Sequence, residues 1–474
     1  MLFSSITFLF MFLPATLLLY YISPDKIKNI VLLICSLLFY AWGEPRYVIV
    51  MFVMVCIGYG MGRLTDIQKK KQNKTGARVV LVCTIIVDIG VLFFFKYMGF
   101  FASNIKNLAG IDLKLPKLSL PLGISFYTFQ LLSYNIDVYR GTIAVQKNIR
   151  KLFTYITLFP QLIAGPIVRY DAVCAQLDRR IVDTESFGEG AKRFIIGLAK
   201  KVLLANMAGE IHDMIIKTAD AHSTILLMWI GSFAFTVQIY FDFSGYSDMA
   251  IGLGRMFGFT FPENFEYPYI SKSITEFWRR WHITLSSWFR DYVYIPLGGN
   301  RGSVIMTLRN LFVVWLLTGL WHGAAWNFVL WGLYYFVLLV FEKFILGTCM
   351  NKVPKILSHI YTMFFVNLGW VLFSYESLSE LKNAIFGMFG GGNRSFCNDY
   401  TLYIIRSYAG FFIIAMIAST PLMKRLFSNV RETTVKSRSK IRDFIVVSWM
   451  IFLLIVSTAT LASESFNPFL YFRF

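Results

Sequence analysis

The sequence predicts an all-α protein that crosses a lipid bilayer many times, on the evidence of its composition and its long apolar runs. Hydrophobic residues make up 56% and charged residues 15% of the chain, whereas a soluble domain carries about 25% charged residues. The mean hydropathy is +0.58. Several runs reach the roughly 20 apolar residues that a helix needs to cross a bilayer. These observations exclude a soluble multi-domain protein.

The apolar runs predict about eleven membrane-embedded helices, some of them partial, in one integral-membrane domain over residues 1–474. The first run has no basic segment before it and no small-residue cleavage site, so we expect a retained helix rather than a signal peptide. Glycine and proline inside "PLGISFYTFQ" and "LFPQLIAGP" indicate broken helices around a cavity. The runs are Leu2–Ile22, Lys28–Trp42, Tyr47–Met61, Val79–Phe101, Leu122–Val138, Leu152–Ile163, Phe194–Met207, Thr224–Phe241, Asn310–Phe341, Ile356–Phe373, Ile404–Thr420 and Phe444–Ala462.

The net charge of +19 follows the loops between the apolar runs, which is typical of the positive-inside rule rather than of a nucleic-acid partner. The most basic loops are Asp66–Arg78 and Lys424–Arg442. We expect both on the cytoplasmic side, and the N-terminus on the opposite side. The terminal "SESFNPFLYFRF" then lies outside or at the outer interface.

The cysteines and histidines give no sign of a disulfide framework or a metal site. The chain has 6 cysteines and 5 histidines, without a CxxC or HExxH spacing. Cys35, Cys56 and Cys83 lie inside apolar runs, where cysteine behaves as a small hydrophobic residue. We therefore expect no metal and no tightly bound cofactor.

The segment "FWRRWHITLSSWFRDYVYIPLGGNR" is too polar to cross hydrocarbon alone. On one helix over Glu276–Arg290, the side chains of Arg279, Ser286 and Arg290 fall within about 40° of one another, with His282 at the edge. Aromatic and apolar residues fill the opposite face. Two interpretations stay open. The helix lies at the membrane interface with arginines toward headgroups, or it lines a polar cavity that binds a phosphorylated substrate.

His322 lies in Asn310–Phe341, a run of 32 nearly charge-free residues. At 1.5 Å per residue the run would measure about 48 Å as one helix, against a hydrocarbon core of about 30 Å. We therefore predict a break near "LWHGAAW". An ionisable residue at membrane depth indicates a functional site, and neutral imidazole suits general-base catalysis. The alternative is a structural histidine bonded to a carbonyl. Asn327 is one of the few other polar side chains in the run.

A weaker signal comes from Asp242, Ser244 and Asp248 in "YFDFSGYSDMAIG". Aspartate and serine side chains commonly cap helix ends. We therefore interpret this stretch as a polar helix end rather than as chemistry.

Three long blocks of the sequence, "YFDFSGYSDMAIGLGRMFGFTFPENFEYPYIS", "EFWRRWHITLSSWFRDYVYIPLGGNR" and "LTGLWHGAAWNFVLWG", resemble the membrane-bound O-acyltransferase (MBOAT) family. The resemblance is to the branch of bacterial alginate O-acetyltransferases and of peptidoglycan or cellulose O-acetylating proteins. It implies a ring of tilted helices around a central tunnel. It also implies that His322 is the tunnel histidine and His282 the family's second catalytic histidine.

The resemblance further implies an acetyltransferase of the bacterial cytoplasmic membrane. Acetyl-CoA would be the cytoplasmic acyl donor, with Arg279, Arg290, Ser286 and Asn327 as substrate-binding residues. The acetyl group would cross the membrane to an extracellular polysaccharide such as alginate, cellulose or peptidoglycan. An extracytoplasmic SGNH-hydrolase-like partner would finish the transfer.

Three alternatives remain at this stage: D-alanyl transfer to teichoic acid, a glycan transporter, and a scaffold subunit. A transporter of this size predicts inverted repeats, which are not visible in the sequence.

The predicted topology is testable by labelling single cysteines in intact cells. We expect cysteines placed in Asp66–Arg78 to resist an impermeant thiol reagent until the membrane is opened, because basic loops stay cytoplasmic. A cysteine at Arg46, in the short turn "GEPR" that the same topology places outside, should label in intact cells and serves as the control. Labelling of the basic loop in intact cells would reverse the predicted orientation.

Overall fold

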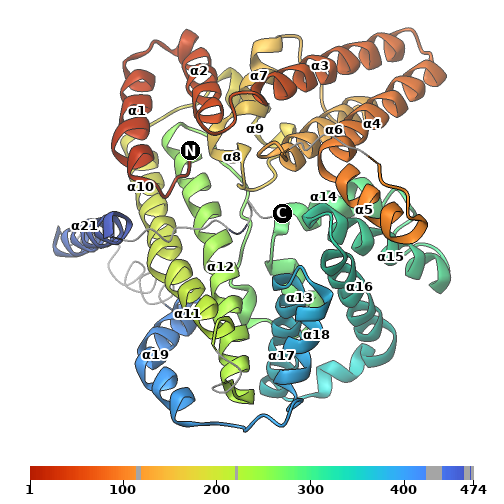
Figure 1. The fold of residues 1–474 in the computed structure, drawn as a ribbon. Helices are drawn as coiled ribbons and strands as arrows, with labels where there is room; N and C mark the ends of the chain where they lie inside the picture. Colours follow the sequence, from red (N-terminus) through yellow and green to blue (C-terminus); the bar gives the residue numbers. More distant parts are fainter. Residues whose placement is uncertain (114–118, 219–222, 423–439, 464–469, 471–474) are drawn as a thin grey trace. The chain divides into compact units, whose positions relative to one another are not determined.

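The computed structural model describes residues 1–113, 119–218, 223–422, 440–463 and 470. Within these residues the regular elements are helices, without a strand (Figure 1). Nine of the described helices are long and apolar enough to cross a membrane, and a shorter apolar helix covers Phe8–Ile22. The all-α, multi-pass class is therefore confirmed, whereas the predicted count of about eleven is not. Residues 424–439, 464–469 and 471–474 of the predicted basic loop and outer tail lie outside the described residues.

The first of two compact units comprises residues 1–194 and 246–263. Within it α6 is almost completely buried against α3 and α4, and Lys69 of α3 donates from Nζ to the carbonyl of Val138 at 2.8 Å. The predicted run Leu152–Ile163 forms two short helices instead of one, with Pro160 in the first turn of the second. The unit contains η1 (Phe8–Phe12), α1 (Leu13–Ile22), α2 (Asp25–Gly43), α3 (Val48–Lys70), α4 (Lys74–Lys96), α5 (Met98–Ala109), α6 (Ile124–Arg140), α7 (Ile149–Thr157), α8 (Phe159–Leu162), α9 (Tyr170–Asp178) and most of α10 (Thr184–Ala199).

The second unit comprises residues 195–245 and the described part of 264–474. Its core is a large cluster of buried aromatic side chains. The long helix α12 (Ile225–Met256) begins in this unit and ends in the first. The other elements are η2 (Lys200–Asn206), α11 (Met207–Ile216), η4 (Pro268–Ile270), α13 (Ile274–Arg280), α14 (Ile283–Phe289), η5 (Arg290–Tyr294), α15 (Val304–His322), α16 (Trp326–Val340), η6 (Phe341–Leu346), η7 (Gly347–Lys352), α17 (Lys355–Ser374), α18 (Leu378–Met388), α19 (Asp399–Ala418) and α21 (Lys440–Ser463).

The predicted break near "LWHGAAW" is confirmed. Helix α15 ends at His322, the backbone of Gly323 is extended, and α16 begins at Trp326. The two helices pack as a hairpin with close backbones. A methyl group on Gly319 would lie 2.4 Å from the carbonyl oxygen of Phe328 in α16. Glycine is therefore required for this approach, as is common where helices pack in membranes.

The prediction of one continuous helix over Glu276–Arg290 is wrong. Helix α13 ends at Arg280, and α14 begins at Ile283. Between them Trp281 is extended and His282 adopts a left-handed conformation with φ of 44°. Neither glycine nor proline marks this break in the sequence.

Hydrogen bonds from residues 264 and 266, between α12 and η4, stabilise the break between α13 and α14. The amide of Ile283 donates to the carbonyl of Asn264 at 3.0 Å, and the amide of Glu266 donates to the carbonyl of Arg280 at 2.9 Å. Because these main-chain bonds replace helical ones, the helix stops. Arg279 and Arg290 consequently do not share one helical face.

The interpretation of Asp242, Ser244 and Asp248 as a helix end is also wrong, because α12 continues to Met256. Asp248 instead pairs with Arg193 of α10 at 2.9 Å within the first unit. Each aspartate pairs with a cation from a distant part of the chain rather than with its own helix end: Asp242 pairs with Lys201, and Asp248 with Arg193.

The close packing of α15 and α16 generates a stability prediction. In Gly332→Ala the added methyl would lie 2.4 Å from the carbonyl oxygen of Trp315, so we expect a loss of about 1–3 kcal/mol, the usual range for overpacking. The measurement is the midpoint of thermal unfolding in detergent, followed by size-exclusion chromatography.

The matched control is Gly410→Ala in α19, where the new methyl meets no atom within 4 Å. It should keep or raise the midpoint, since alanine favours helix over glycine by about 1 kcal/mol. Equal midpoints for Gly332→Ala and the wild type would contradict the close approach.

Candidate active site

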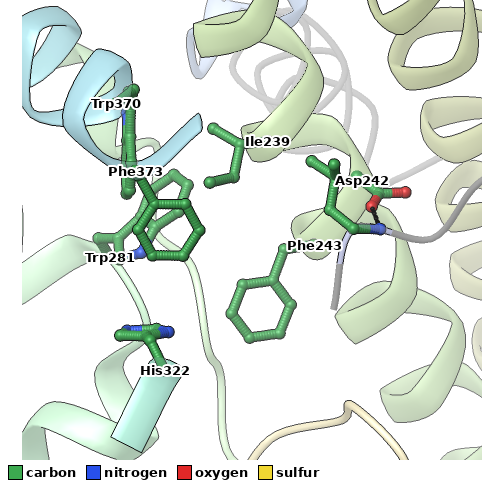
Figure 2. Close-up of a pocket in the computed structure, with 8 residues that line it drawn as sticks. Ile239, Asp242, Phe243, Trp281, His322, Trp370 and Phe373 are labelled. Carbon is green, nitrogen blue, oxygen red and sulfur yellow. Dashed lines mark hydrogen bonds between the residues drawn. The ribbon is translucent and has the colours of Figure 1, made fainter. Parts of the chain in front are cut away.

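A pocket in the second unit is lined by both a predicted catalytic histidine, His322, and a buried aspartate, Asp242. Figure 2 shows His322 below Phe373 and Trp281, with Asp242 on the far side beyond Phe243. The walls are otherwise apolar. The lining residues are Ile239, Asp242, Phe243, Trp281, His322, Trp370, Phe373 and Leu470.

His322 is positioned by the end of α15 and by two aromatic rings. Its imidazole lies 5.0 Å from the ring of Trp331 and 5.3 Å from that of Phe373, both nearly perpendicular. Only 6% of the residue is exposed. Such a setting excludes water and fixes the ring, as general acid–base catalysis requires.

Asn327 supports this wall and is not one of the pocket-lining residues. Its Nδ2 donates to the carbonyl of Phe373 at 3.3 Å. That carbonyl lies in the last turn of α17, where helical partners are missing. The structure thus places Asn327 behind the pocket, at the residue that packs against His322.

Asp242 forms a buried ion pair that the sequence reasoning missed. Lys201 Nζ lies 2.8 Å from Asp242 Oδ1, and the two side chains are 2% and 3% exposed. Lys201 also donates to Asn206 Oδ1 at 2.8 Å, and the other carboxylate oxygen, Oδ2, accepts the amide of Leu470 at 2.9 Å. Lys201 lies in η2, a π-helical stretch, and π turns are frequent at functional sites. The only available signal was a lysine inside one apolar run and an aspartate directly after another.

His282 lies beside the pocket rather than in its lining. Its ring is 4.7 Å from that of Phe243 and 5.7 Å from that of Trp321, and Trp321 lies 5.1 Å from His322. The two predicted histidines are therefore gathered around Trp321. His282 lies outside the nine candidate spans. Burial lowers the pKa of His282 well below its usual value, so its imidazole is neutral.

Three predicted substrate-binding residues, Arg279, Ser286 and Arg290, lie outside the pocket lining. Arg279 and Arg290 are exposed and Ser286 is partly buried. The guanidinium of Arg290 is bonded through Nε to Asp291 Oδ1 at 2.6 Å. Their contact with a phosphorylated donor stays a prediction. Among the described residues, no three of the His, Cys, Asp and Glu side chains gather as metal ligands would.

Comparison with known proteins gives matches along the entire chain. The model of the membrane-bound O-acyltransferase family matches residues 145–381, a range that includes every pocket residue except Leu470. The "Probable alginate O-acetylase AlgI" of Azotobacter vinelandii is 36% identical, with 100% of both chains covered. Its namesake from Pseudomonas aeruginosa is 43% identical over 83% of this chain and 75% of the relative. The "Peptidoglycan O-acetyltransferase" of Helicobacter pylori is 31% identical over 100% of this chain and 98% of the relative.

Helices able to span a membrane, a buried histidine pocket and full-length similarity to O-acetyltransferases lead to one conclusion. The chain belongs to the membrane-bound O-acyltransferase family and is a multi-pass membrane acyltransferase.

Proposed function

We propose that the protein transfers an acetyl group from acetyl-CoA toward the hydroxyl groups of an extracellular polysaccharide, and that the transfer takes place at the pocket of His322. The names of its full-length relatives, an alginate O-acetylase and a peptidoglycan O-acetyltransferase, support the acetyl group and the glycan acceptor. The single observation that carries the location is His322, buried at a helix break and facing a pocket with aromatic walls.

In the proposed reaction, neutral His322 takes the proton of the attacking hydroxyl while its oxygen forms a bond to the thioester carbonyl. The carbon–sulfur bond then breaks, and the imidazolium returns the proton to the leaving thiolate of coenzyme A. The aromatic walls exclude water, which would otherwise hydrolyse the thioester. The hydroxyl belongs either to the glycan or to the serine of an extracytoplasmic SGNH-hydrolase-like partner.

The donor enters from the cytoplasmic side of a bacterial cytoplasmic membrane in this proposal. Arg279 and Arg290 bind the phosphates of coenzyme A, and Ser286 is the neighbouring hydroxyl on the same segment. Exposure of both arginines supports this role, since each can be reached by a soluble donor. Asn327 contributes indirectly, by holding Phe373 against His322.

The role of His322 is tested by His322→Gln and His322→Ala in membranes supplied with radiolabelled acetyl-CoA and glycan. Glutamine cannot take a proton at neutral pH, so we expect acetyl transfer to fall by about 10²–10⁴-fold, the usual worth of general-base catalysis. Protein level in the membrane should be unchanged.

His359→Gln is the matched control, because it makes the same exchange at a partly buried histidine outside the pocket, whose Nδ1 lies 3.0 Å from the carbonyl oxygen of Ser271. It should keep near-normal activity. A well-expressed His322→Gln protein with normal transfer would exclude His322 as the base. Recovery of D-alanine instead of acetate from the modified glycan would exclude the acetyl group.

The donor site is tested by Arg279→Ala and Arg290→Ala. Loss of a phosphate contact removes binding that is equal in the ground and transition states, so KM for acetyl-CoA should rise several-fold with little change in kcat. Arg406→Ala, which removes another exposed arginine, in α19, is the control and should change neither constant. An unchanged KM in both variants would show that these arginines do not bind the donor. The interpretation that this segment lies at the membrane interface would then be favoured.

A further inference from the structure

Asn264, which lies between α12 and η4, makes an unusual set of contacts at the edge of the site. Its side-chain oxygen Oδ1 accepts from the hydroxyl of Thr284 at 2.8 Å and from the amide of Thr284 at 3.3 Å. The same oxygen lies 3.1 Å from Nδ1 of His282. Asn264 is 0% exposed. One buried oxygen is thus shared by three atoms, two of Thr284 and one of His282.

These contacts determine which nitrogen of His282 carries the proton. A backbone amide can only donate, so the atom that faces Thr284 must be the carbonyl oxygen of Asn264 and not its NH₂ group. Nδ1 of His282, which faces the same oxygen, must therefore be the protonated nitrogen. A neutral imidazole has only one N–H, which leaves the lone pair on Nε2.

The imidazole is neutral because of its surroundings. His282 is 1% exposed and packs edge to face against Phe243, and burial lowers its pKa well below the usual value. The hydrogen bond made by one ring nitrogen then sets the protonation of the other.

We propose that Asn264 is a positioning residue for the acyl transfer, holding His282 in the Nδ1–H tautomer so that the lone pair of Nε2 can accept a hydrogen bond from a reacting group, while His322 remains the base that takes the proton of the hydroxyl. The inference rests on the proposed function and adds to it that His282, the second predicted catalytic histidine, takes part in the transfer. Asn264 itself acts only through His282.

The backbone around His282 does not depend on the side chain of Asn264. The left-handed conformation of His282, with φ of 44°, is held by the bonds of Ile283 to the carbonyl of Asn264 and of Glu266 to Arg280. Those bonds use main-chain atoms, which any substitution of Asn264 keeps. The side chain can therefore be changed while the break between α13 and α14 persists.

The first test measures the tautomer directly, by ¹⁵N NMR of histidine-labelled protein in lipid bilayers. His282 is assigned by the signal lost in His282→Gln. We expect a protonated Nδ1 and an unprotonated Nε2 in the wild type. Asn264→Asp, which keeps an acceptor oxygen, should keep the proton on Nδ1, whereas Asn264→Leu should move it to Nε2. A protonated Nε2 and a bare Nδ1 in the wild type would overturn the proposal.

The second test measures acetyl transfer by the same variants at matched membrane level and unfolding temperature. Asn264→Leu should lower kcat by about 10–100-fold, the range known for removal of the residue that orients a metal-binding histidine, and change KM for acetyl-CoA little. Asn264→Asp should recover part of the loss. Thr284→Val is the matched control, since it removes a donor to the same oxygen without touching His282, and should stay near wild type.

The outcomes separate the two proposals. An equal loss in Thr284→Val and Asn264→Leu, or normal kcat in Asn264→Leu, would overturn the role of Asn264. A wild-type protein that transfers no acetyl group from acetyl-CoA would instead overturn the proposed function, while the NMR result would stand.

Discussion

A helix that is interrupted within a membrane protein must find protein partners for the backbone groups it frees, because hydrocarbon offers none. Both histidines of the site lie at helix interruptions, His322 at the end of a candidate span and His282 outside the candidate spans. His322 ends α15, where α16 turns back so closely that Gly319 and Gly332 face each other. His282 lies between α13 and α14, where main-chain atoms of Asn264 and Glu266 supply the missing bonds. The neighbouring segments therefore fix the local backbone at each histidine. A fixed backbone in turn limits the movement of the imidazole rings.

The pocket between aromatic walls combines an apolar setting with one buried ion pair. The rings of Trp331 and Phe373 pack against His322, which is only 6% exposed. The pair of Lys201 and Asp242 keeps a carboxylate in the same wall. Removal of one partner from a buried pair typically costs about 3–5 kcal/mol. Asp242 contacts both Lys201 of η2 and the amide of Leu470 and thereby holds this wall together.

Much of this arrangement could be predicted from residues near one another in the sequence. The 32-residue run Asn310–Phe341 is too long for one span, so its break beside His322 followed from length alone. The break at His282 could not be predicted in this way, because the sequence has no glycine or proline there. It depends on Asn264, 18 residues earlier. The ion pair of Lys201 with Asp242 could not be predicted for the same reason, since the two residues are 41 positions apart and no local pattern connects them.

The prediction that Arg279 and Arg290 share one helical face was wrong for a related reason, since it assumed an uninterrupted helix. That the arginines of this segment bind a charged donor stays a prediction. Helical periodicity is reliable while the helix continues, and tertiary hydrogen bonds decide where it stops.

The most direct test of acyl transfer at the histidine pocket is a cryo-electron microscopy structure with a non-hydrolysable acetyl-CoA analogue. We predict that the acetyl end lies in the pocket, within hydrogen-bond reach of His322, and that the phosphates extend toward Arg279 and Arg290. An analogue bound with its acetyl end away from His322, in a protein that retains transfer activity, would contradict the assignment.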